Sequence, residues 1–180
     1  MTDLVFLPPG TVCCRDQPTV LVTILGSCVA VCLWDRIRRV GGMNHFLLPR
    51  CGSAPRSARY GDVAFIRLLA RMEQLGCRAA DLRAKVFGGA AVLPIGAHRD
   101  TVGTQNVTLA LEILRLHGIP VIARRTGGKR GLYLRLHTGT GRVMVRELAD
   151  AANAEPGRHG PLRQTKASCT VLCLAQDAMR

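Results

Sequence analysis

The sequence is poor in aromatic and acidic residues, and it has no apolar run long enough to cross a membrane. Aromatic side chains make up 4% of the 180 residues, so the stacking platforms used by many proteins that bind single-stranded nucleic acid are scarce. No helix-turn-helix, zinc-finger or RNA-recognition pattern is present. The longest apolar stretch, residues 19–34, is interrupted by Gly26 and Ser27 and is shorter than the roughly 20 residues of a spanning helix. These absences argue against nucleic-acid binding and against membrane insertion.

The N-terminus and the cysteines point to a cytoplasmic protein. The first ten residues, MTDLVFLPPG, lack a basic region followed by a long apolar one, so no secretion signal is expected. The eight cysteines contain no C-x-x-C spacing, and disulfide frameworks belong mainly to short secreted chains. The C-x-x-x-C pairs Cys28/Cys32 and Cys169/Cys173 do not match the usual zinc-binding spacing. We therefore expect mostly buried thiols and no zinc site.

The charge balance points to an acidic partner. Twenty-five Lys and Arg against twelve Asp and Glu give a formal net charge of +13. A positive surface attracts acidic proteins as well as nucleic acids. If the partner is a nucleic acid, the affinity for it should fall steeply as the salt concentration rises.

Short strands alternate with two helical segments. A helix that starts at Asp62 and runs to about Leu75 is predicted by its apolar stripe and by Gly76 as a stop. A second helix, capped by Thr104, is predicted to end near Leu116. The predicted strands are residues 19–25, 29–34, 39–48, 83–87 and 119–124, followed by a hairpin over 131–148. This pattern predicts a mixed α/β (α+β) domain over residues 1–150 and a flexible C-terminal tail over 151–180.

Cys28 and His45 are candidates for a nucleophile and its base. If residues 28–34 and 39–45 form a hairpin around the loop Asp35–Arg38, Cys28 lies opposite His45. Directly opposed residues have Cβ atoms roughly 4.5–5.5 Å apart, which lets an imidazole take the proton of a thiol. Gly26 and Ser27 favour a tight turn before Cys28, which can aim backbone N–H groups at an oxyanion. A core cysteine and a satisfied histidine remain the alternative.

These residues also carry a family resemblance. The stretches TILGSCVAVCLWD (Thr23–Asp35) and GGMNHFLLP (Gly41–Pro49) closely resemble the chemoreceptor glutamine deamidase family, CheD. Further blocks follow in the family's order, namely RYGDVA, AKVFGGA, VGTQNV, TGGKRG and TGTGRVMV. The resemblance covers roughly residues 18–148. Two positions depart from the family's usual pattern, Arg125, where an acidic residue is common, and Leu132, where a basic one is common; both bear on docking of a partner.

The resemblance implies a fold, a reaction and partners. The fold is a sandwich of β-sheets flanked by helices, resembling bacterial toxin deamidases. The reaction hydrolyses side-chain amides of glutamines on methyl-accepting chemotaxis receptors through a Cys thioester, without a cofactor. By this resemblance the nucleophile is Cys28 and the base is His45. The family's site threonine corresponds to Thr23; the alternative is that Thr23 is an ordinary strand residue. The CheC phosphatase is a second implied partner. A competing hypothesis is a non-catalytic adaptor that binds receptors or CheC.

Overall fold

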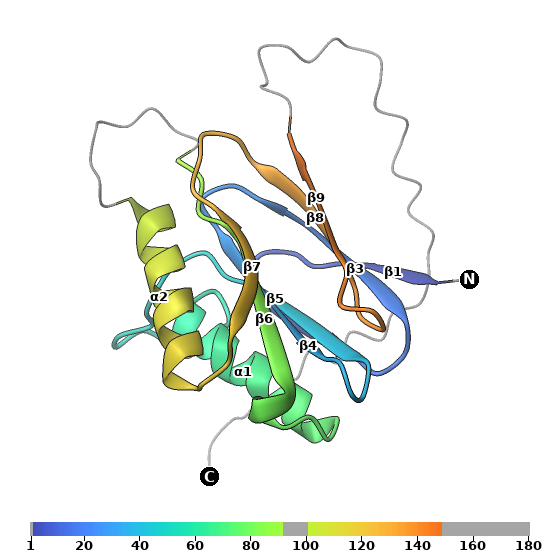
Figure 1. The fold of residues 1–180 in the computed structure, drawn as a ribbon. Coiled ribbons are helices and arrows are strands. Elements are labelled where there is room, and N and C mark those ends of the chain that lie inside the picture. Colours follow the sequence, from blue (N-terminus) through green and yellow to red (C-terminus); the bar gives the residue numbers. More distant parts are fainter. Residues whose placement is uncertain (1, 92–100, 149–180) are drawn as a thin grey trace. The chain divides into compact units, whose positions relative to one another are not determined.

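The computed structural model describes residues 2–91 and 101–148, which form two β-sheets and two helices (Figure 1). One sheet has four strands in the order β1-β3-β8-β9 and the other has five in the order β2-β5-β4-β6-β7. The four-stranded sheet consists of β1 (Asp3–Phe6), β3 (Thr19–Leu25), β8 (Leu132–His137) and β9 (Val143–Glu147). The five-stranded sheet consists of β2 (Thr11–Arg15), β5 (Val40–His45), β4 (Val29–Asp35), β6 (Leu82–Gly88) and β7 (Val121–Thr126). The helices are α1 (Gly61–Gln74) and α2 (Val102–Leu116), with a short 3₁₀ turn at Ala79–Asp81.

Two apolar cores separate three layers. One core lies between the five-stranded sheet and the helices and includes Leu33 and Phe65. The other lies between the two sheets and includes Met43 and Leu134. The five-stranded sheet is therefore covered on both faces, which explains the nearly continuous apolar sequence of β4. The predicted mixed α/β sandwich with flanking helices is confirmed.

The helix starts differ from the prediction. Thr101, not Thr104, caps α2, because the Thr101 side chain accepts a hydrogen bond from the N–H of Thr104. Asp62 lies inside the first turn of α1, where its carboxylate accepts hydrogen bonds from the N–H groups of Cys51 and Val63. Both helices end within a residue of the predicted positions, each before a glycine with positive φ, Gly76 or Gly118.

The N-terminal strands β1 and β2 were not predicted from the sequence. β1 pairs in parallel with β3 at the edge of its sheet, and β2 pairs with β5 at the edge of the other. Their four and five residues carry little alternation between buried and exposed positions, so they give no clear periodic signal. The predicted tail over 151–180 lies outside the described residues. Neither described helix is long and apolar enough to cross a membrane.

Candidate active site

Cys28 lies where the chain crosses from one sheet to the other, between the end of β3 and the start of β4. It is half-buried and packs against the core between the sheets. The three carbonyl oxygens of this turn all accept hydrogen bonds. Ala90 N–H donates to the carbonyl of Gly26 at 2.9 Å, Asn106 Nδ2 to that of Ser27 at 3.2 Å, and Gly89 N–H to that of Cys28 at 2.8 Å. These bonds hold the Cys28 turn against β6 and α2.

Gly88 lets β6 approach this turn. Its φ of 106° lies in the region that favours glycine. A Cβ built at Gly88 would collide with the carbonyl oxygen of Cys28. The Gly88-Gly89 pair therefore serves close backbone packing around the Cys28 turn.

The predicted register between Cys28 and His45 is wrong by two residues. Asp35 pairs with Val40, and the bridge between Val29 and Phe46 continues the same register, which puts Ala30 opposite His45. The turn starts one residue later than predicted because the Asp35 carboxylate, at the strand end, accepts hydrogen bonds from the N–H groups of Ile37 and Arg38 at 2.8 and 3.0 Å.

The two-residue shift keeps Cys28 and His45 on one face of the sheet. Side chains alternate between faces with a period of two, so a shift of two preserves the face that a shift of one would lose. Ala30 and Met43, which flank the pair on their strands, belong to the core between the sheets. Cys28 and His45 are therefore diagonal neighbours on that face, and a diagonal pair has a separation of roughly 7–8 Å.

His45 is held by a hydrogen-bond chain that crosses the sandwich. Its Nδ1 lies 2.8 Å from Oγ1 of Thr23, and Thr23 Oγ1 donates to the carbonyl oxygen of Leu7 at 2.7 Å. The single hydroxyl proton is used on Leu7, so Thr23 must accept from a protonated Nδ1. Nε2 then carries a lone pair. Within the described residues Nε2 is buried and has no hydrogen-bond partner, which leaves it available as a base.

The ionisation of the two candidates favours a neutral pair at rest. Burial lowers the pKa of His45 below 6.5, although the Leu7 carbonyl opposes that shift. Burial raises the pKa of the Cys28 thiol above 9.0, opposed by the backbone N–H of Cys28 itself. At neutral pH the imidazole is therefore a free base, and the Cys28 sulfur is a thiol. That state suits proton transfer during attack better than a resting thiolate–imidazolium pair.

We expect His45 to titrate below pH 6.5 in the folded protein, because burial penalises the imidazolium. At neutral pH its Nδ1 should carry the proton. Carbon and nitrogen NMR shifts of labelled histidine report both the pKa and the tautomer. The same chain in denaturant should titrate near 6.5 and provides the reference. A folded-state pKa above 6.5, or a proton on Nε2, would contradict this assignment.

Two groups at the site were not found from the sequence. The Leu7 carbonyl anchors the Thr23 hydroxyl, and no side-chain pattern marks a backbone oxygen. Asn106 is fully buried in α2 and donates from Nδ2 to the carbonyls of Ser27 and Leu47. It thus ties the Cys28 turn to the segment that follows β5. Asn106 is a polar residue on the buried face of α2 and lies inside the block VGTQNV. That position was the signal from which the sequence could have indicated a role for Asn106.

The other cysteines lie in different surroundings. No disulfide joins the six cysteines of the described residues. Burial raises the pKa of Cys14 and Cys32 to about 12, which makes these thiols unreactive at neutral pH. Across residues 2–91 and 101–148, no group of three or more His, Cys, Asp or Glu side chains is arranged to hold a metal ion.

Comparison with known proteins shows similarity along most of the chain. A family model described as "CheD chemotactic sensory transduction" matches residues 47–147. A Rhodospirillum rubrum protein, "Probable chemoreceptor glutamine deamidase CheD", is 56% identical over 163 residues, covering 91% of this chain and 93% of the relative. An Anaeromyxobacter dehalogenans relative, "Probable chemoreceptor glutamine deamidase CheD 1", is 49% identical over 146 residues, covering 80% and 84%. A Sulfurimonas denitrificans relative with the first relative's name is 41% identical over 132 residues, covering 72% and 85%.

Proposed function

This chain belongs to the CheD family, and from that premise we propose that it is a chemoreceptor glutamine deamidase with Cys28 as nucleophile and His45 as base. Its substrates are glutamine side chains on the cytoplasmic domains of methyl-accepting chemotaxis receptors, so it acts in the cytoplasm. The observation that carries the proposal is the His45 ring, whose Nδ1 is held by Thr23 while Nε2 has no partner in the described part of the chain. A histidine placed only for packing has no need of a buried, unsatisfied nitrogen.

The first half of the reaction is acyl transfer. His45 Nε2 takes the proton of the Cys28 thiol as the sulfur attacks the carboxamide carbon of the substrate glutamine. The C=O π-electron pair moves to oxygen, and backbone N–H groups at Ser27 and Cys28, in the turn that Gly26 opens, stabilise this oxyanion. The tetrahedral intermediate collapses, the C–N bond breaks, and His45 delivers its proton to the leaving ammonia. A thioester between Cys28 and the former glutamine remains.

The second half is hydrolysis. With ammonia gone, His45 Nε2 takes a proton from a water molecule, and the hydroxyl oxygen attacks the thioester carbon. Collapse of this intermediate breaks the C–S bond, returns the proton to sulfur and leaves glutamate on the receptor. Thr23 acts through His45 by keeping the proton on Nδ1 throughout. No cofactor is required by any step.

A non-catalytic adaptor that binds receptors or the CheC phosphatase is the competing function, and isotope incorporation separates the two. A purified receptor cytoplasmic domain is incubated with the protein in ¹⁸O-labelled water and then analysed by peptide mass spectrometry. Deamidation through a hydrolysed thioester places one ¹⁸O in each new glutamate side chain. Hydroxylamine added during turnover should divert part of the product to a hydroxamate. Binding of the receptor without either mass change would support the adaptor instead.

A further inference from the structure

The connection between β7 and β8 runs beside the Cys28 turn. Thr126, the last residue of β7, pairs with Gly88, which in turn pairs with Val29. At the other end of the connection, Leu132 pairs with Leu25. At this end of the sandwich the chain thus crosses between the sheets through Cys28 and again through residues 127–131 (Figure 1). Residues 127–131 therefore lie beside the Cys28 turn.

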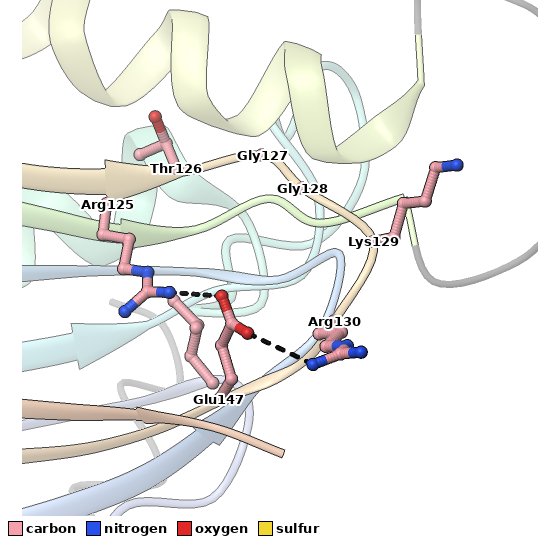
Figure 2. A pocket seen from close by; sticks show the side chains of 8 residues that line it. Arg125, Thr126, Gly127, Gly128, Lys129, Arg130 and Glu147 are labelled. Carbon is pink, nitrogen blue, oxygen red and sulfur yellow. Dashed lines mark hydrogen bonds and ion pairs between the residues drawn. The ribbon is translucent and has the colours of Figure 1, made fainter. Parts of the chain in front are cut away.

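Residues 125–130, here called the basic loop, line a pocket of about 320 Å³ together with Leu132 and Glu147. Figure 2 shows the Glu147 carboxylate between the guanidinium groups of Arg125 and Arg130. Lys129 points away from this cluster and is exposed. In the described part of the chain Lys129 has no ion-pair partner. The loop therefore keeps a positive charge beside the Cys28 turn, although Arg125 and Arg130 pair with Glu147 of β9.

The backbone of the basic loop has space around its two glycines. Gly127 and Gly128 have φ values of 75° and 84°, and among the described residues a Cβ at either would meet no atom within 4 Å. Hydrogen bonds from Gly127 N–H to Gly88 and from Ala91 N–H to Gly128, both 2.9 Å, hold the loop on the segment that also holds the Cys28 turn. The loop is thus anchored by these hydrogen bonds, and within residues 2–91 and 101–148 its glycines leave room for a partner.

We propose that the basic loop is a docking site for an acidic segment of the substrate, with Lys129 contacting a carboxylate near the target glutamine. The inference rests on the proposed deamidase function and adds the chemistry that selects the glutamine. Val29 and Thr126 are two strand spacings apart, on the order of 10 Å. Lys129 follows Thr126 by three residues, so its distance from Cys28 lies within the length of a few turns of a helical substrate. Glutamines with an acidic residue within a few helical turns are therefore preferred.

The test compares two single variants, each of which replaces one positive charge by a negative one. Lys129→Glu changes the charge of the basic loop, and Arg36→Glu makes the same change in net charge at an exposed position in the β4–β5 turn. Arg36 lies at the far end of the seven-residue strand β4, about 20 Å or more from Cys28. Both proteins are assayed on a receptor cytoplasmic domain whose modified glutamine has been mapped, and on a receptor variant in which nearby glutamates are replaced by lysine. Fluorescence anisotropy measures binding of each receptor in parallel.

We expect Lys129→Glu to raise KM and Kd about fivefold at low salt while kcat stays unchanged, because one exposed ion pair is lost and replaced by repulsion. Arg36→Glu should change either constant less than about twofold. The lysine-bearing receptor should bind poorly to the wild-type protein and recover affinity with Lys129→Glu. Equal effects of both substitutions, or no recovery, would overturn the docking proposal. Absence of deamidation by the wild-type protein would instead refute the deamidase function, and the binding measurements would still decide whether the basic loop docks the receptor.

Discussion

Cys28→Ala is expected to lower kcat for glutamine deamidation by at least about 10⁴-fold, since removing a covalent nucleophile leaves only binding and electrostatic assistance. Alanine keeps the Cβ, and the carbonyl hydrogen bonds of the turn do not involve the sulfur. The fold should therefore be retained by circular dichroism, and receptor affinity should change little. Ammonia release and peptide mass spectrometry measure the reaction.

Cys51→Ala is the matched control for this substitution. Cys51 is also a partly exposed thiol, and it lies in the loop before α1, where its Sγ contacts the Ala54 carbonyl. Its replacement should leave kcat within about twofold of wild type, since no step uses it. Retained activity in Cys28→Ala, or an equal loss in Cys51→Ala, would refute the assignment of Cys28 as nucleophile.

His45→Gln is expected to lower kcat by roughly 10²–10⁴-fold, the usual contribution of a general base. The glutamine side chain can donate a hydrogen bond to Thr23 but cannot take up a proton at neutral pH. The loss should appear in both halves of the reaction. Single-turnover mass spectrometry should therefore show slow formation of the thioester and slow hydrolysis of the thioester once it has formed.

Substitutions at Thr23 separate the chemistry of His45 from its packing. Thr23→Val removes the acceptor for Nδ1 but keeps the shape of the side chain, so kcat should fall about tenfold or more as the other tautomer becomes populated. Thr23→Ser restores a hydroxyl and should recover most of the activity. Equal activity of the valine and serine variants would show that Thr23 is an ordinary strand residue.

Full activity of His45→Gln would contradict the role of His45 as the base.

The sequence predicted most of the central elements because their signals are local. The strands β3 and β4 and the glycine-containing turn between them follow from apolar runs broken at Gly26 and Ser27. The ends of both helices follow from glycines that can adopt positive φ. The starts were less clear, because several polar residues near each start can accept a hydrogen bond from a free N–H group, and the packing of the preceding loop decides between them.

The register between β4 and β5 depends on a hydrogen-bonding contact of one side chain. The sequence pattern does not show which of two possible turns that contact favours. A four-residue turn beginning at Asp35 or at Arg36 satisfies the same alternation of side chains. The carboxylate of Asp35 decides it by accepting hydrogen bonds at the strand end. The two choices differ by two residues in register, so the face shared by Cys28 and His45 was predicted correctly although their direct opposition was wrong.

The sequence by itself determined the types of the site residues, the strands and the turn that carry Thr23, Cys28 and His45, and the family to which the chain belongs. Only the tertiary structure decided how the site is held together. Thr23 meets His45 because their strands lie in different sheets packed face to face, and the proton on Nδ1 follows from the carbonyl of Leu7 on a third segment. Asn106 reaches the Cys28 turn from a helix 79 positions further along the chain. Such long-range contacts arise from the packing of layers, which a pattern of neighbouring residues does not encode.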